Sequence, residues 1–223
     1  EAFLRQSLGV EIVSHTAAGD VETGRPLGPG RTTGRVVEIV AYGLPPGLGS
    51  HVQADRRLEA RLAAAFFGVA GVCRMEIGEG FEVATRRGSS AHDEIFGCVG
   101  DGGVTVYRRT NRAGGLEGGM TNGQPLVVRL AISPARPTTT SIGFDGIPDH
   151  DGVSAMGMVG QSLMSLVLMD AVLEKFGGTT LADTRTNASS FIRHLRIRTQ
   201  APSADAPANR PAGHSSYSRP ISE

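Results

Sequence analysis

The sequence TNRAGGLEGGMTNGQP, residues 110–125, decides how the rest of the chain is interpreted. It holds five glycines and two asparagines and has almost no large side chains. Glycine adopts positive φ angles without steric cost, and asparagine tolerates them better than most residues. Such a backbone can direct successive N–H groups toward one point and form a concave site for an anion. The alternative is a long, loose hairpin connection, because glycine-rich loops are weakly specific.

Strand-like sequence flanks this glycine-rich stretch on both sides. Residues 104–107 (VTVY) and the basic pair Arg108 and Arg109 precede it, and residues 126–132 (LVVRLAI) follow it. We therefore predict a loop held between two strands, a position where binding groups are often placed.

The composition excludes several classes of function. Lys and Arg together number 22, as do Asp and Glu, so no net charge favours nucleic acid or an anionic membrane. Aromatic residues make up 5% and tryptophan is absent, which argues against a stacking platform for single-stranded nucleic acid. Cys73 and Cys98 provide neither a disulfide framework nor a metal-site spacing. We expect a cytoplasmic protein without a signal peptide or a bound metal.

The N-terminal half alternates helical and strand-like patterns. A helix is predicted near residues 3–8, ending at Gly9, with strands at 10–13 and 33–43 and a loop at 16–34. The clearest helix is 55–69 (DRRLEARLAAAFFGV), with Asp55 as its N-cap and an apolar face of Leu58, Leu62, Ala65 and Phe66. Residues 74–83 (RMEIGEGFEV) are predicted to form a broken strand.

The C-terminal half contains one strongly apolar segment. Residues 153–173 carry four methionines and raise the question of a membrane span, but Gln161, three serines and Asp170 interrupt them. We predict a core or interface helix there, a final helix at 180–196 and a disordered tail at 199–223. Since helices do not alternate strictly with strands, the fold class is α+β rather than a doubly wound parallel sheet.

Two further segments concentrate polar side chains. Residues 86–94 (RRGSSAHDE) combine two guanidinium groups with hydroxyls, an imidazole and two carboxylates, which suits binding a phosphate and relaying protons. The alternative there is a solvated loop with ordinary salt bridges. Residues 144–152 bring three aspartates together, but they lack the glutamate and the rest of a calcium loop.

Six segments in order carry a resemblance to a known family. They run from residue 2 to residue 178, within a resemblance that covers about residues 2–196, and the glycine-rich stretch and LEKFGG (173–178) are close to diagnostic. The chain resembles chorismate synthase. The matching segments are AFLRQSLGVEIVSH (2–15), GRVVEIVAYGLPPGLGS (34–50), RRLEARLAAAFFGVAGV (56–72), EIGEGFEVATRRGSSAHDE (76–94), TNRAGGLEGGMTNGQPLVVR (110–129) and LMSLVLMDAVLEKFGG (163–178).

The resemblance implies a fold, a reaction and a cofactor. The implied fold is a β-α-β sandwich with internal pseudo-symmetry, here a domain at 1–198 without the family's N-terminal third, and the implied assembly is a homotetramer. The implied reaction is the 1,4-elimination of phosphate from 5-enolpyruvylshikimate-3-phosphate to give chorismate, a step of aromatic amino acid biosynthesis. Reduced FMN is the family's obligate cofactor, and some members reduce it with NADPH.

The resemblance also assigns roles to individual residues. It places Gly118, Ala70 and Gly71 at flavin contacts, and Asp149 at an aspartate associated with proton handling near the flavin. The family's flavin-binding turn falls on Ser133, Pro134, Ala135, Arg136 and Pro137.

The chain departs from the family pattern at several positions. Ile147 stands in place of a motif arginine, Asp151 in place of a cysteine, and Ser133 in place of a lysine. Losing a cation removes charge assistance worth about 1.5–3 kcal/mol per hydrogen bond. His15, His92 and His150 do not match the family's two catalytic histidines. The alternative function is therefore a non-catalytic relative that serves as a flavin-binding, anion-binding or assembly subunit.

Overall fold

A four-stranded antiparallel sheet forms the centre of the molecule. The computed structural model describes residues 1–17, 35–100, 103–133, 149–195 and 197–200. The strand order in this sheet is β1-β2-β8-β3, so the strand that follows the glycine-rich stretch lies between β2 and β3. Its strands are β1 (Glu11–Ala17), β2 (Arg35–Tyr42), β3 (Val72–Ile77) and β8 (Leu126–Ile132).

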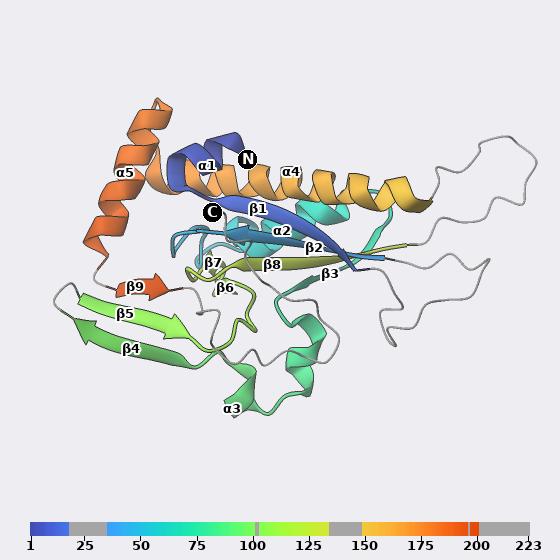
Figure 1. Ribbon diagram of the computed structural model, residues 1–223, viewed down its shortest axis with the longest axis horizontal. Coiled ribbons are helices and arrows are strands. Elements are labelled where there is room, and N and C mark those ends of the chain that lie inside the picture. Colours follow the sequence, from blue (N-terminus) through green and yellow to red (C-terminus); the bar gives the residue numbers. More distant parts are fainter. Residues whose placement is uncertain (18–34, 101–102, 134–148, 196, 201–223) are drawn as a thin grey trace, which may run out of the picture.

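Helices cover one face of this sheet. Figure 1 shows the long helix α4 lying along the strands, with α5 at one end of the molecule beside α1. The alternate residues of β2 and β8 that face the helices, among them Ile39 and Val128, are fully buried. The helices are α1 (Ala2–Leu8), α2 (Leu58–Phe67), α4 (Asp149–Phe176) and α5 (Leu181–His194).

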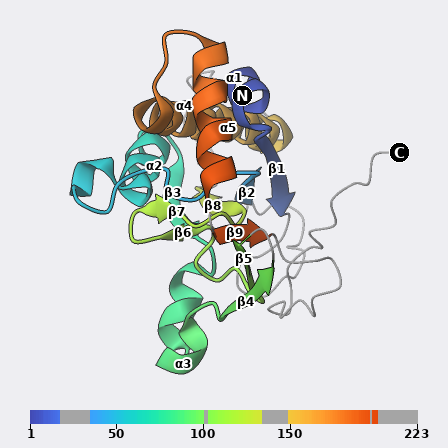
Figure 2. The ribbon, with the colours of Figure 1, turned by 90° about the vertical axis from the view of Figure 1, so that its left-hand side faces the viewer.

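A second, smaller sheet lies on the side away from α4 (Figure 2). Its strands β4 and β5 form an antiparallel hairpin, and β9 pairs with β5 in parallel. The bounds of these and the remaining elements are β4 (Ile95–Gly100), β5 (Gly103–Arg108), β9 (Ile197–Gln200), the hairpin strands β6 (Leu116–Glu117) and β7 (Met120–Thr121), the short helix α3 (Gly88–Ala91), and the 3₁₀ turns at Ala54–Arg56 and Gly80–Thr85.

Most of the predicted elements are confirmed, and the α+β class is correct. Helix α1 ends at Gly9, whose φ of 71° is left-handed, and the predicted face of α2 buries Leu58, Leu62 and Phe66 completely. The prediction for 74–83 is only partly right, because β3 ends at Ile77 and a 3₁₀ turn follows.

The prediction that Asp55 caps α2 is wrong. Asp55 lies in the preceding 3₁₀ turn, and α2 follows Arg57, whose side chain makes no capping bond. The Leu58 amide instead donates to the carbonyl oxygen of Gly119, at 3.0 Å. The glycine-rich stretch thus supplies an acceptor that the local sequence could not show.

Helix α4 matches the prediction of a core or interface helix. Residues Ala155–Phe176 are long and apolar enough to cross a membrane by length and composition, yet the helix packs on β1, β2 and α2. Met164 and Leu168 on its inner side are fully buried, whereas Met158 and Leu166 on its outer side are 64% and 57% exposed. The predicted loop at 16–34 and tail at 199–223 begin too early, because residues 16 and 17 belong to β1 and residues 199 and 200 belong to β9. The rest of both segments, 18–34 and 201–223, lies outside the described residues.

Candidate functional site

The glycine-rich stretch is a compact, mostly buried loop. The flanking strands β5 and β8 belong to different sheets, so the interpretation as a long, loose hairpin connection is wrong. Within the stretch, β6 and β7 form a tight hairpin that turns at Gly118 and Gly119, with φ angles of 62° and 93°. The stretch therefore joins the two sheets as a folded unit.

Most of its glycines permit close contact between backbones. A Cβ atom added at Gly115 would lie 2.5 Å from the carbonyl oxygen of Pro125. The same test at Gly114 meets the backbone of Gly78, and at Gly119 it meets the carbonyl of Ser50. Real side chains do not tolerate such approaches, so these glycines are required by packing.

An anion already occupies the concave backbone at the start of the stretch. The Asp93 carboxylate accepts hydrogen bonds from the amides of Arg112 at 2.8 Å and Ala113 at 3.0 Å. It also accepts one from the Thr110 hydroxyl, and Asp93 is only 8% exposed. Adjacent backbone N–H groups commonly bind anions in this way. Two backbone amides of the stretch thus bind an anion, but they belong to Arg112 and Ala113 rather than to the glycines, and the anion is the protein's own carboxylate.

The side chains of the polar segment 86–94 make contacts with different parts of the molecule. Arg86 pairs with Glu79, from Nε to Oε2 at 2.7 Å, and also with Glu82. The hydrogen bond to Glu79 raises the pKa of Arg86 above its ordinary value. Asp93 is held by the backbone amides, so the predicted phosphate-binding and proton-relaying set does not gather as a unit. Ser90 and Glu94 lie apart from these residues.

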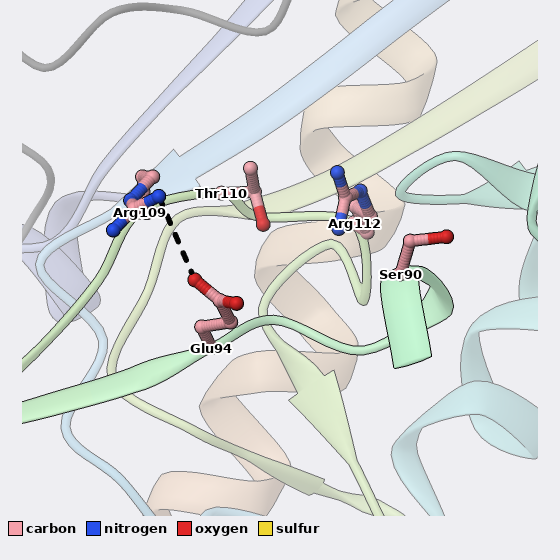
Figure 3. A pocket seen from close by; sticks show the side chains of 5 residues that line it. All are labelled: Ser90, Glu94, Arg109, Thr110 and Arg112. Carbon is pink, nitrogen blue, oxygen red and sulfur yellow. Dashed lines mark ion pairs between the residues drawn. The ribbon is translucent and has the colours of Figure 1, made fainter. Parts of the chain in front are cut away.

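Ser90 and Glu94 line a cavity of about 180 Å³, together with three residues from the end of β5 and the start of the glycine-rich stretch. Figure 3 shows these five side chains, with Arg109 and Glu94 facing each other and Arg112 beside α3. The Arg109 Nη1 lies 3.7 Å from Glu94 Oε2. The three other lining residues are Arg109, Thr110 and Arg112.

A sequence model of the family described as chorismate synthase matches residues 27–173. This chain belongs to the chorismate synthase family. The chorismate synthase of Saccharopolyspora erythraea is 42% identical over 245 residues, which cover 89% of this chain and 61% of that protein. The chorismate synthase of Thermobifida fusca is 43% identical, with 88% and 61% covered.

A solved structure agrees with this family membership. A crystal structure of chorismate synthase superposes with a TM-score of 0.64 at 40% identity, covering 75% of this chain and 45% of that one. The chain spans about three fifths of the length of the curated chorismate synthases that it matches.

Two glycines at expected cofactor positions lie in open surroundings, unlike the glycines that pack against backbone. Gly118 and Gly71 both have positive φ, and an added Cβ would meet no atom within 4 Å at Gly118 and only Ile132 Cγ2, at 3.8 Å, at Gly71. Gly9 and Gly177 also have positive φ and open surroundings, but they follow the ends of α1 and α4. These two expected cofactor glycines thus leave backbone accessible to a ligand, and the residues present fit a flavin contact there.

The expected cofactor residues fall into two groups. The Ser133 amide donates to the carbonyl oxygen of Gly71 at 2.8 Å, and Ala70 adjoins Gly71. Gly118 lies beyond the other end of α2, since Gly119 contacts Leu58 at its first turn. A helix of ten residues is about 15 Å long. A single ligand that touches both groups of one chain must lie along this helix.

The remaining expected site residues carry less structural information. Asp149 is the first residue of α4, and its side chain is not among those described. Pro134, Ala135, Arg136, Pro137 and Ile147 lie outside the described residues. Within the described part of the chain, no three His, Cys, Asp or Glu side chains gather in a way that would hold a metal ion.

Proposed function

We propose that this chain forms part of a chorismate synthase, a lyase that eliminates phosphate from 5-enolpyruvylshikimate-3-phosphate to give chorismate. The observation that carries the proposal is the match to the family over residues 27–173, together with relatives of that name at 42% and 43% identity. The open glycines Gly71 and Gly118 support it, because they coincide with positions that the family uses for its cofactor.

The proposed cofactor is reduced FMN, with NADPH as a candidate source of its electrons. When bound, FMN lends electron density to the substrate as the phosphate group leaves. The main chain at Gly118 and at Gly71 would lie against the cofactor, since neither carries a Cβ and both have open space on that side. The turn from Ser133 to Pro137 would hold the cofactor's polar groups, and Asp149 would hold a proton near the reacting ring.

Two substitutions favour a second candidate function. Ser133 and Ile147 replace a lysine and an arginine of the family pattern, and neither can supply a positive charge to a flavin or a phosphate. The second candidate is therefore a non-catalytic relative that binds flavin or an anion within an assembly. In either case we propose a homotetramer in the cytoplasm, as the resemblance implies.

The test is an anaerobic assay of the purified 223-residue chain with reduced FMN and 5-enolpyruvylshikimate-3-phosphate. Release of inorganic phosphate supports the synthase, whereas saturable FMN binding without phosphate release supports the non-catalytic relative. Absence of both phosphate release and FMN binding contradicts the synthase and the flavin-binding relative, and leaves only the anion-binding relative.

A matched pair of variants tests the proposed cofactor contact. Gly118→Ala and Gly9→Ala introduce the same methyl group at similar φ angles, 62° and 71°, with no atom within 4 Å of either. Both should therefore lose similar stability, about 1–2 kcal/mol from the left-handed backbone. Only Gly118→Ala should weaken FMN binding, measured by fluorescence quenching. Equal FMN affinity in the two variants would remove Gly118 from the cofactor site.

A further inference from the structure

The cavity in Figure 3 is built from residues that the family resemblance gives no role. Ser90 comes from α3, Glu94 from the residue before β4, and Arg109, Thr110 and Arg112 from the chain that leaves β5. None of them is an expected cofactor position. The two guanidinium groups and two hydroxyls bring several hydrogen-bond donors to one small space.

Arg112 carries donors that the described residues do not satisfy. Its side chain is only 11% exposed, and its Nε is buried without a hydrogen bond. That Nε lies 3.4 Å from Glu79 Oε1, which is an ion-pair distance, but the two atoms are not aligned as a hydrogen bond. Nη1 donates to the carbonyl oxygen of His92 at a long 3.4 Å. Buried N–H groups normally have partners. Because Nε faces Glu79 and Nη1 faces His92, Nη2 is the nitrogen of this guanidinium that is left for an acceptor in the cavity.

The neighbouring carboxylates are already engaged. Both oxygens of Glu79 accept from Arg86, at 2.7 Å from Nε and at 3.0 Å from Nη2. Glu94 faces Arg109, and Asp93 accepts from Thr110 and two backbone amides. Since the single negative charge of Glu79 is shared by Arg86 and Arg112, the charge of Arg112 is only partly neutralised.

We propose that this cavity binds an oxyanion, a carboxylate or a phosphate group, whose oxygens accept from the guanidinium of Arg112. Nη2 and the second hydrogen of Nη1 are the donors of Arg112 that remain for such a group, and the charge of the guanidinium strengthens these hydrogen bonds. Arg109 adds a second cation at the mouth, where it is 57% exposed. Asp93 and Glu94 repel the ligand, so binding is weak and falls as ionic strength rises.

The experiment is an NMR titration of the full 223-residue chain, labelled with ¹⁵N, that follows the Arg112 Nε–Hε signal and the amides of residues 90 and 109–112. Sodium phosphate and sodium acetate are added separately, with sodium chloride at matched ionic strength as the reference. A saturable shift with phosphate alone assigns a phosphate site, and a shift with acetate as well assigns a site for either oxyanion. No saturable shift with phosphate or acetate overturns the proposal.

Variants tie any shift to the cavity. Arg112→Lys keeps the positive charge but loses the planar guanidinium group with its several N–H donors. It should weaken oxyanion binding by about tenfold or more. Arg109→Gln is the safer variant for folding, because Arg109 is largely exposed, and it should also weaken binding. Arg87→Gln is the control, since Arg87 is exposed nearby but does not line the cavity. Equal weakening in Arg87→Gln would show non-specific screening and overturn the site. FMN binding is measured in a separate experiment, so a negative result for the oxyanion site leaves the proposed function unaffected.

Discussion

The glycine-rich stretch and helix α4 contradict what their compositions suggest. The stretch is polar, rich in glycine and almost without large side chains, yet Gly114, Gly115, Thr121 and Gln124 within it are buried. Helix α4 is apolar enough to resemble a membrane span, yet Met158 and Leu166 on one side of it are more than half exposed.

The comparison shows that contacts, rather than residue type, decide which side chains are buried. In the stretch, Asp93 holds the backbone amides, and Asn111 accepts from the Gly115 amide and donates to the Pro125 carbonyl. In α4, apolar residues occur on both the inner and the outer side, but within the described residues only those on the inner side are fully buried. A helix of that kind is normally buried all round.

The largest expected effect breaks the packing of the stretch. Gly115→Ala combines a left-handed backbone with a Cβ placed 2.5 Å from the Pro125 carbonyl oxygen. We expect a loss of about 4 kcal/mol in the free energy of unfolding, the sum of backbone strain and overpacking. Urea denaturation measures it, with Gly118→Ala as the matched control in open space. Similar losses in the two variants would mean that the stretch is loose after all.

The next effect tests the two sides of α4. Leu168→Ala removes a fully buried side chain from the core and should lower stability by about 3 kcal/mol. Leu166→Ala is the matched control, because it deletes the same atoms from a side chain that is 57% exposed, and it should change stability by about 0.5 kcal/mol or less. A loss at Leu166 as large as that at Leu168 would show that the outer side is covered in solution.

The smallest effect concerns the anion that the stretch already holds. Asp93→Asn removes the negative charge and leaves one of the three donors, from Thr110, Arg112 and Ala113, without an equally good acceptor. We expect a loss of about 2 kcal/mol and faster hydrogen exchange at the amides of 112 and 113. Glu94→Gln, at a side chain that is 61% exposed, is the control. Unchanged exchange at those amides would contradict the proposed role of Asp93.

Local pattern was sufficient for much of the fold. Hydrophobic periodicity predicted the apolar face of α2 and the strand 126–132. The preference of glycine for positive φ predicted the end of α1 at Gly9. The start of α2 could not be predicted in the same way. Its acceptor, Gly119, is 61 residues away from Leu58, and Asp55 is a plausible cap for a helix that starts elsewhere.

The sequence predicted which residues belong to the candidate site, but not how they are arranged in space. The family resemblance named Gly71 and Gly118. Gly71 directly follows the predicted helix 55–69, but nothing in the sequence indicated that Gly118 lies near the other end of that helix. The role of Asp93 was also missed, because an aspartate among arginines, serines and a histidine has no visible partner in sequence. The cavity beside it joins Ser90 and Glu94 of the polar segment 86–94 to Arg109, Thr110 and Arg112 at the start of the glycine-rich stretch. Its one sequence signal was the pair of arginines, Arg109 and Arg112, at that start.

The sequence by itself determined the family, through the resemblance of its segments, and the α+β class and the apolar helix and strand faces, because these faces depend on periodicity. Only the tertiary structure decided which glycines pack against backbone and which leave it open, and which carboxylate fills the anion-binding concavity. Those outcomes depend on atoms that are distant in sequence, such as Gly115 against Pro125 and Asp93 against Arg112, and they exist only once the chain has folded.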